Sequence, residues 1–516
     1  MHPPQVNFRF QQFFTMNIRM IQSEVFYFAA LWLVLACVSP TAATVADNEQ
    51  PYNVLFIISD DLTSSALSCY GNTVCQTPNI DALAARGTRF TSAYCQGTYC
   101  GPSRASFMSG YYPHATGELG YKNPRPRIGD RATWSQHFKN NGYYAARVSK
   151  IYHMGIPGGI EVGHGQPGHL GSHGADDLAS WTERFNSPGP EWKAAGDSEL
   201  LEGNPTGDKP SRGGNTFTVV EADGDDMVHS DGKTAAKAVD LLRAHREKPF
   251  WLGVGFVRPH VPFVAPRSYY EAFKPYSNMV LPAKVEGEHD DTPKAGINYK
   301  TSQNMRMDVR RQKKAVGAYY ASVAFMDAQV GKVMAELKRS GLEDNTIVIF
   351  TSDHGYHLGE HDFWAKVSLR DESAGVPLII CVPGKTPAVC DSFVELLDLY
   401  PTISKLCNLE VPMRLQGQDI SKMLDDPSFE VREAAFCVAP MRKGFLLRDK
   451  KWAYIQYGED AKNGIELFDM QNDPKQIDNL ASVAEYNPVV NAYKAKLKDK
   501  LGELRDNDLG QPSKLK

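Results

Sequence analysis

Short, continuous runs of β-branched and apolar residues recur along this chain, and the segments between them have helical periodicity. The run Asn53–Ser59 (NVLFIIS) lacks polar alternation, which is typical of a strand buried on both faces of a parallel sheet. Further strands are expected at Tyr144–Val148, Phe250–Phe256, Thr346–Phe350 and Val376–Val382. Helices are expected from Thr77-Pro78 to Gly87, at Thr133–Asn140, at Lys233–Arg246, and along the stripe Val323, Met326, Val330, Val333 and Leu337. Strands alternating with helices predict a doubly wound α/β sheet.

The pattern changes after about residue 410. Short strands are expected at Gly444–Leu447, Trp452–Gln456 and Glu466–Asp469, followed by a last helix from Asn487-Pro488 to Leu504. We therefore predict a main α/β domain over residues 47–405 and a smaller α+β subdomain over residues 406–516. Residues 155–230 form a long insertion rich in Gly, Pro and Asp.

The first 46 residues have the layout of a secretory signal peptide. Val25–Val38 is an apolar run of fourteen residues, shorter than the roughly 20 needed to span a membrane. Arg9 and Arg19 precede it, and small residues follow it. We predict a secreted or periplasmic protein, with residues 1–46 removed. Two alternatives are a lipoprotein, in which Cys37 carries the lipid at the membrane surface, and a buried core segment.

Net charge and cysteine content exclude some classes of protein. Lys and Arg number 56 and Asp and Glu number 60, giving a net charge of −4. This balance argues against a nucleic-acid-binding protein, which would show a basic excess. Nine cysteines include Cys37 and Cys100, which leaves seven. An odd number makes no closed disulfide framework, although one or two bridges are compatible with an oxidising compartment.

Ionisable residues follow the expected strands at the same end. In open α/β sheets, ligands bind beyond the carboxyl ends of the strands. Each of four strands delivers such groups there: Asp60 and Asp61, Lys150 and His153, Arg258 and His260, and Asp353 and His354. One such pair is compatible with a solvated loop, but four together predict a binding cleft.

Asp60, Asp61 and Asp353 would repel one another without a counterion. A hard divalent cation is the economical reason to gather them, since it prefers oxygen ligands. Calcium is the leading candidate because of the carboxylates. The imidazole of His354 keeps magnesium and transition metals as alternatives.

The segment from Cys100 to Gly110 (CGPSRASFMSG) carries the most specific motif. Its C-x-P-S-R start, followed by a short helix, resembles the signature of the type I, formylglycine-dependent sulfatases. Asp60-Asp61 upstream and Ser352-Asp353-His354-Gly355 downstream strengthen the resemblance, which covers about residues 50–480. Three segments look most like the iduronate-2-sulfatase branch: Lys150–His153, Arg258–Phe263 and Asp353–Lys366. The resemblance implies an alkaline-phosphatase-like, mostly parallel sheet sandwiched by helices.

The resemblance also implies a mechanism. Cys100 is converted to Cα-formylglycine by a formylglycine-generating enzyme, and one hydroxyl of its hydrate attacks the sulfur of a sulfate ester. Asp60, Asp61, Asp353, His354 and modified residue 100 hold the metal. Arg104 holds the nucleophile as oxyanion, Lys150 and Lys366 grip sulfate oxygens, His153 takes a proton from the second hydroxyl, and His260 protonates the leaving alcohol.

We expect a sulfated carbohydrate as substrate. The run after Lys366 and the 155–230 insertion diverge from mammalian iduronate enzymes, so the particular sugar stays open. Two other functions compete: a phosphate or phosphonate monoester hydrolase of the same superfamily, and a non-catalytic carbohydrate-binding protein with Cys100 unmodified.

Overall fold

The structure, a computed structural model, describes residues 51–117, 119–154, 173–203 and 216–510. The predicted signal peptide and Cys37 lie outside these residues. In the part of the chain that is described, no helix is long and apolar enough to cross a membrane.

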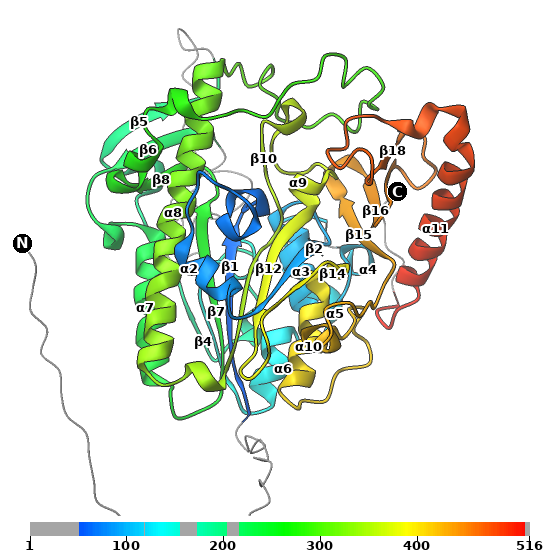
Figure 1. Cartoon of the computed structure of the whole chain (residues 1–516). Helices are drawn as coiled ribbons and strands as arrows, with labels where there is room; N and C mark the ends of the chain where they lie inside the picture. The colour runs from blue at the N-terminus through cyan, green and yellow to red at the C-terminus, as the bar shows by residue number, and fades with distance from the viewer. Residues whose placement is uncertain (1–50, 118, 155–172, 204–215, 511–516) are drawn as a thin grey trace, which may run out of the picture. The chain divides into compact units, whose positions relative to one another are not determined.

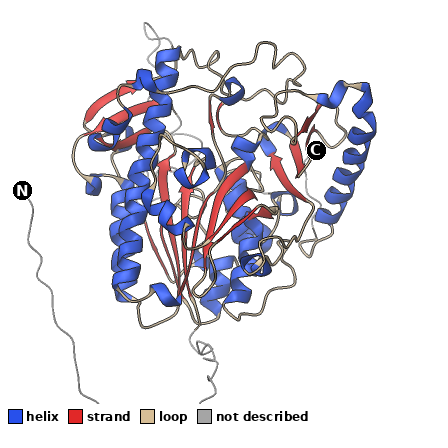
Figure 2. Ribbon diagram, viewed as in Figure 1, coloured by secondary structure: helices blue, strands red, loops and turns tan. Residues whose placement is uncertain are grey.

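A mostly parallel sheet of nine strands forms the centre of the unit Pro51–Lys516 (Figures 1 and 2). Its order is β13-β2-β12-β9-β1-β7-β3-β4, with β14 also paired to β2. The strands β9, β1, β7, β3 and β4 run parallel, whereas β12 is antiparallel to both of its neighbours. The bounds are β1 Asn53–Asp60, β2 Thr88–Tyr94, β3 Tyr144–Ser149, β4 Glu183–Phe185, β7 Phe250–Pro259, β9 Thr346–Ser352, β12 Gly375–Cys381, β13 Ala388–Cys390 and β14 Val394–Glu395. The expected strands are present, and the expected doubly wound sheet is confirmed.

Helices cover both faces of this sheet, and β1 shows why. All eight residues of β1 are buried. On one face of the sheet, Leu55 and Ile57 pack in a core with α2 (Pro78–Ala84), α7 (Ser230–Ala244) and α8 (Val309–Arg339). On the other face, Val54, Phe56 and Ile58 pack in a core with α3 (Cys100–Ser109), α6 (Trp134–Asn140) and α10 (Leu399–Leu406). Unbroken apolar character in the strand therefore corresponds to a sheet sandwiched between two helical layers.

Several helix boundaries differ from expectation, and α7 spans Ser230–Ala244 where Lys233–Arg246 was expected. Helix α2 ends at Ala84 and not at Gly87, which instead lies so close to the neighbouring strand that a Cβ there would be 2.5 Å from Cys381 Sγ. Helix α11 (Asn487–Arg505) has Tyr486 at its N-cap, so Asn487 is already the first helical residue. Helix α6 begins at Trp134, one residue later than expected, and Thr133 is its N-cap in a capping box with Gln136.

The C-terminal subdomain is an antiparallel sheet of four strands packed against α11. Its strands are β15 Ala434–Ala439, β16 Gly444–Asp449, β17 Trp452–Tyr457 and β18 Ile465–Asp469. The first of these, with the sequence AAFCVA, was not predicted. A bridge between Gly97 and Val438 joins β15 to the segment just before Cys100.

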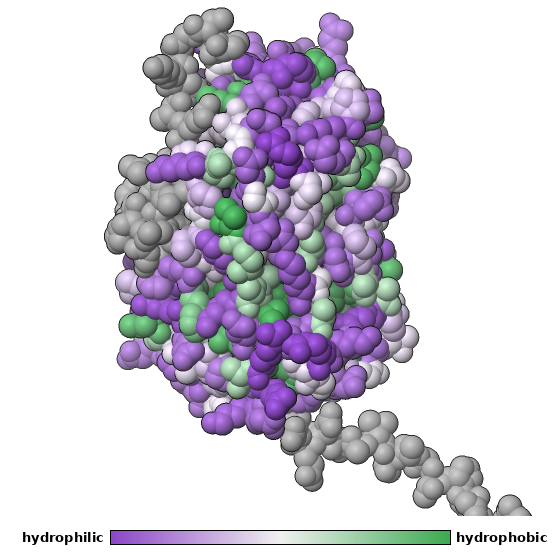
Figure 3. Space-filling view, turned by 90° about the vertical axis from the view of Figure 1, so that its left-hand side faces the viewer, coloured by the Kyte–Doolittle hydropathy of each residue, from purple (hydrophilic) through white to green (hydrophobic). Residues whose placement is uncertain are grey.

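The described part of the 155–230 insertion adds β4 to the central sheet and two strands to a second one. There β6 (Thr218–Ala222) lies between β5 (Gly196–Leu200), to which it is antiparallel, and β8 (Phe263–Pro266), to which it is parallel. The remaining elements are short: α4 Pro113–Thr116, α5 Arg125–Ile128, α9 Asp371–Ala374, β10 His357–Leu358 and β11 Trp364–Ala365. The side of the molecule at the left of Figure 1 is mostly hydrophilic, with scattered apolar side chains (Figure 3).

Candidate active site

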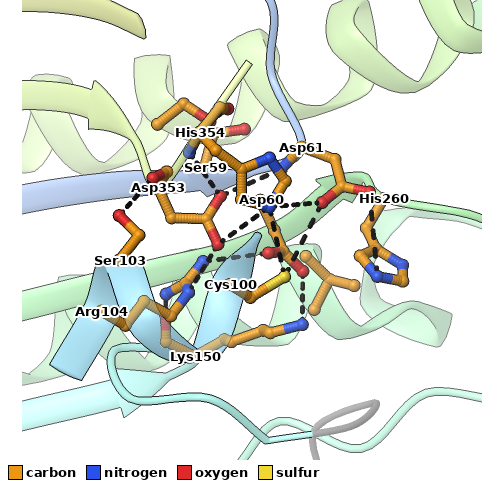
Figure 4. A network of polar contacts seen from close by, with 12 residues as sticks. Ser59, Asp60, Asp61, Cys100, Ser103, Arg104, Lys150, His260, Asp353 and His354 are labelled. Carbon is orange, nitrogen blue, oxygen red and sulfur yellow. Dashed lines mark hydrogen bonds and ion pairs between the residues drawn. The ribbon is translucent and has the colours of Figure 1, made fainter. Parts of the chain in front are cut away.

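The carboxyl ends of the parallel strands bring the predicted residues together, as Figure 4 shows for most of them. Asp60 ends β1, Asp353 follows β9 directly, Lys150 follows β3, and His260 follows β7. All of these side chains are buried. The four strand ends therefore form one cluster.

Cys100 is the first residue of α3, with Tyr99 at the N-cap. The sequence predicts that this helix begins near Pro102, and the structure begins it two residues earlier. Cys100 Sγ lies 3.4 Å from His354 Nε2, 3.2 Å from Lys366 Nζ and 3.8 Å from Asp61 Oδ1. Burial, followed by the charge of Asp60, raises the pKa of the Cys100 thiol, so an unmodified cysteine here is a poor nucleophile.

Arg104 ties two of the aspartates together. Its Nε donates to Asp353 Oδ2 at 2.8 Å and its Nη2 to Asp60 Oδ1 at 3.1 Å. Its Nη1 donates to the carbonyl oxygens of Lys150 and Ile151. All three guanidinium nitrogens thus donate to the two aspartates and to backbone carbonyl oxygens. The contact with residue 100 that was predicted for Arg104 stays a prediction.

Two lysines complete the charge balance. Lys150 Nζ pairs with Asp60 Oδ2, and Lys366 Nζ lies 2.6 Å from Asp61 Oδ1. Burial by itself would lower the pKa of Lys366, but Asp61 and Cys100 outweigh it and hold that pKa well above its usual range. With Arg104, three buried cations face the three aspartates.

The carboxylates also fit a divalent cation. The potential ligand atoms of Asp60, Cys100, Asp353 and His354 lie within 4.8 Å of one another, as do those of Asp60, Asp61, Cys100 and His260. Asp61 Oδ2 is buried and accepts no hydrogen bond from the described residues. Buried polar atoms without a partner are rare, and a bound cation would satisfy this oxygen. The structure therefore contains a candidate metal site at the predicted ligands.

Asp61 occupies this position through an unusual backbone. Its φ is +65°, in the left-handed region, and its N–H donates to Asp353 Oδ1 at 3.2 Å. Strained backbone of this kind is retained mainly at functional sites. It turns the Asp61 side chain towards His354, whose Nε2 lies 3.1 Å from Asp61 Oδ1.

His260 is held by a buried network. Arg258 donates to the carbonyl oxygens of His260 and Pro262 and pairs with Glu191, while Asp231 accepts from the N–H groups of Val257 and Arg258. His260 Nε2 lies 3.8 Å from Asp61 Oδ2. Burial is the main cause that lowers the pKa of His260 to about 4. Glu191 and Asp231 were not predicted, because nothing in the sequence signals a contact across residues 191–258.

His153 lies against an aromatic ring. Its ring stacks on that of Tyr121, with 4.1 Å between centroids. Burial and the neighbouring Lys150 lower the pKa of His153 well below its usual range, and its Nδ1 is buried without a hydrogen-bond partner among the described residues. A neutral imidazole with a free nitrogen can accept a proton.

A cavity of about 360 Å³ opens beside these residues. It reaches Asp61 and Lys366, and its walls are largely aromatic: Tyr99, Tyr121, Phe217, Tyr299 and Tyr356. Lys300 adds a cation, which pairs with Glu202. Sequence reasoning missed these lining residues, because they come from loops whose meeting point depends on the whole fold.

Comparisons with known proteins agree with this geometry. Residues 52–409 match the family model described as Sulfatase, and residues 359–506 match the one described as N-sulphoglucosamine sulphohydrolase, C-terminal. The iduronate 2-sulfatase of Homo sapiens is 32% identical over 435 residues, which are 74% of this chain and 75% of the human one. A sulfatase of Formosa agariphila is 29% identical over 493 residues, 91% of each chain.

Solved structures share the fold. A phosphonate monoester hydrolase from Silicibacter pomeroyi superposes with a TM-score of 0.71 at 20% identity, covering 88% of this chain and 96% of that one. A 2-O GAG sulfatase superposes with a TM-score of 0.66 at 22% identity, covering 89% and 93%. These likenesses confirm the alkaline-phosphatase-like architecture. The family model that covers most of the chain and the relative at 32% identity show that this protein is a hydrolase of the sulfatase family.

Proposed function

We propose that the protein removes sulfate from a sulfated carbohydrate, using a formylglycine at position 100 and a divalent cation, with calcium the first candidate and magnesium the alternative. The observation that carries the proposal is the position of Cys100. It begins a buried helix and lies within 4 Å of Lys366, His354 and Asp61. The relatives named for activity on iduronate or other sulfated sugars support a carbohydrate substrate.

The cations of the site would bind the sulfate group. Asp60, Asp61, Asp353, His354 and modified residue 100 are the proposed ligands of the metal, which when bound supplies Lewis-acid neutralisation of sulfate oxygens. Lys150 and Lys366 pair with Asp60 and Asp61 in the structure. Once those carboxylates share their charge with a cation, both ammonium groups can bind sulfate oxygens. Arg104 fixes Asp60 and Asp353, and its proposed second role is to stabilise the oxyanion of residue 100.

Two histidines would move protons. Burial and Lys150 hold the pKa of His153 well below its usual range, and its Nδ1, unpaired among the described residues, would take the proton of the second hydroxyl of hydrated residue 100. His260, beside Asp61, would protonate the departing alcohol. The negative charge of a bound sulfate ester raises the pKa of His260 from its low value in the free protein and so favours the protonated acid.

The aromatic cavity suits a sugar ring. Aromatic side chains can pack against the apolar faces of a pyranose, while the polar lining groups Asp61 and Lys366 would contact its substituents. A sulfated uronic acid of the kind named for the human relative is therefore the first substrate to test.

The conversion of Cys100 and the export of the chain are also proposals. Conversion of Cys100 needs a formylglycine-generating enzyme as partner. Residues 1–46 are proposed to direct the chain to the periplasm or outside the cell, with lipid attachment at Cys37 as the alternative. The proposed catalytic domain is 47–405 and the proposed subdomain 406–516.

The proposal is tested by measuring turnover of matched sulfate and phosphate esters. Purified protein should hydrolyse sulfated mono- and disaccharides and an aryl sulfate, and act much more slowly on the corresponding aryl phosphate. The peptide Phe90–Arg104 should be lighter by about 18 Da than its thiol form. Faster turnover of aryl phosphate or phosphonate would favour the second candidate, which the fold of the phosphonate hydrolase supports. An intact thiol with no turnover would indicate a binding protein.

A further inference from the structure

One tyrosine hydroxyl of the catalytic cavity has no part in the proposed chemistry. Tyr299 lines this cavity together with Asp61 and Lys366. Its hydrogen bonds with the described residues are made by its backbone: the N–H donates to Asn298 Oδ1 at 2.8 Å, and the carbonyl oxygen accepts from Asn304 Nδ2 at 3.0 Å. Within the described parts of the chain, its hydroxyl is therefore left available to a ligand.

The hydroxyl lies at the inner end of the Tyr299 side chain. Of this residue 37% is exposed, yet burial is the main cause that raises the pKa of its phenol. The charge of Lys366 lowers the same pKa, and the charge of Asp61 raises it. These two groups act on the phenol because its hydroxyl is directed towards the catalytic end of the cavity, while the rest of the ring is accessible from solvent.

The backbone around Tyr299 is fixed to the hairpin that delivers Lys366. Asn298 Nδ2 donates to the carbonyl oxygen of Trp364 at 2.9 Å, and the N–H of Trp364 donates to the carbonyl oxygen of Lys300 at 3.0 Å. Trp364 belongs to β11, and Lys366 follows that strand directly. The residues on both sides of Tyr299 are thus held in register with the sulfate-binding end of the cavity. A donor held in this way loses less conformational freedom when it binds a ligand.

The free hydroxyl is suited to the sugar rather than to the sulfate. The proposed partners of the sulfate group already include the metal, Lys150 and Lys366. A phenol can donate a hydrogen bond to a hydroxyl or carboxylate oxygen, and these are the groups that a sugar presents beside its sulfate. The other cation of the cavity wall, Lys300, is already paired with Glu202.

We propose that Tyr299 is a specificity-determining residue, whose hydroxyl donates a hydrogen bond to a sugar oxygen outside the sulfate group. The inference rests on the proposed sulfatase function and adds to it a residue that selects the sugar. The contact is made away from the reacting atoms, so it is present both before and in the transition state. It should therefore act on KM more than on kcat.

The test uses the sulfated sugar that the wild type hydrolyses fastest, together with analogues of it. In each analogue one hydroxyl is replaced by hydrogen, and a carboxylate, where the sugar has one, is replaced by CH2OH. Tyr299→Phe removes only the phenol oxygen. It should raise the KM of the parent sugar by about twofold to tenfold if the acceptor is a hydroxyl, and by about tenfold to 100-fold if it is a carboxylate. On the analogue that lacks the acceptor, and on nitrophenyl sulfate, variant and wild type should have the same KM.

The matched control is Tyr486→Phe, at a half-buried tyrosine of the C-terminal subdomain that packs on Trp452; it should leave every KM unchanged. The melting temperature of Tyr299→Phe should match that of the wild type, because its hydroxyl has no partner to lose among the described residues. An unchanged KM on the parent sugar would overturn the assignment. Equal losses on the parent, on all analogues and on nitrophenyl sulfate would also overturn it, since the hydroxyl would then act on the sulfate group or on the fold. Failure of the proposed function is distinct, because the wild type would then hydrolyse none of the sulfate esters.

Discussion

Lys366 lies between Asp61 and the residue that carries the proposed nucleophile. Its Nζ is 2.6 Å from Asp61 Oδ1 and 3.2 Å from Cys100 Sγ. The flanking residues Ala365 and Val367 have φ of +66° and +85°, a conformation that is costly for a β-branched side chain. The chain thus retains local strain at the point where it delivers an ammonium group next to residue 100.

The first prediction concerns that nucleophile. Cys100→Ala should abolish hydrolysis of sulfate esters, because alanine cannot be converted to an aldehyde. Circular dichroism and the melting temperature should change little, since Arg104 and Ser103 still bind Asp353 from the same helix. Wild-type protein produced without a formylglycine-generating enzyme should be equally inactive. Substantial turnover by Cys100→Ala would refute the proposed mechanism.

The second prediction concerns the metal. Asp61→Asn keeps the shape of the side chain but removes its charge, so affinity for calcium should fall by more than about 100-fold, beyond the losses seen when outer partners of metal ligands are changed. Calorimetric titration of the metal-free protein measures this directly. Chelator should inactivate the wild type, and added calcium or magnesium should restore it.

The control for the metal experiment is Asp499→Asn, at an exposed position on α11. It should bind calcium like the wild type. Full activity of rigorously metal-free wild-type protein would contradict the metal assignment.

Much of the sheet could be predicted because its strands are buried on both faces. Runs such as Asn53–Ser59 need no long-range information to be recognised. By contrast, β2 was missed. Thr88–Tyr94 is not uniformly buried, and it pairs with β12, which is antiparallel to the strands on both sides of it. Its pairing partners lie almost 300 residues away, beyond the reach of local patterns.

The site was predictable where residues follow strand ends and unpredictable where loops meet. Asp60 and Asp353 were placed correctly by the rule that ligands bind beyond parallel strands. Tyr121 and Tyr299 carry no such signal, because they acquire a common neighbour only when the helices and loops pack. Glu191 reaches Arg258 from the insertion for the same reason.

The third prediction concerns pH and stability. His114 is buried against Phe445, and neither ring nitrogen forms a hydrogen bond with the described residues. Burial, with a smaller contribution from Arg505, lowers the pKa of His114 to about 4. The unfolded chain therefore binds a proton at higher pH than the folded one, so stability is lost as pH falls from about 6.5 towards 4.

Between about pH 7 and pH 5 this group should reduce the free energy of unfolding by about 2 kcal/mol. Urea unfolding at both pH values measures the change, and His114→Leu is the matched variant that cannot titrate. The wild type should lose more stability than His114→Leu over this interval. Equal losses in the two proteins would show that His114 is protonated as easily when folded as when unfolded.

The last prediction concerns His260 and separates a leaving-group acid from a residue that only binds sulfate. A sugar alkoxide is a poor leaving group and needs a proton in the transition state, whereas an activated aryl oxide hardly does. His260→Ala should therefore lose about 10²–10⁴-fold in kcat on sugar sulfates, but much less on nitrophenyl sulfate. Lys366→Met is the comparison, because removing a sulfate-binding ammonium should slow both substrates by a similar factor. Glu191→Gln, which weakens the pairing that holds Arg258 and hence the His260 loop, should reproduce the His260→Ala pattern in milder form. Equal losses on sugar and aryl sulfates in His260→Ala would exclude the acid role while leaving the sulfatase assignment intact.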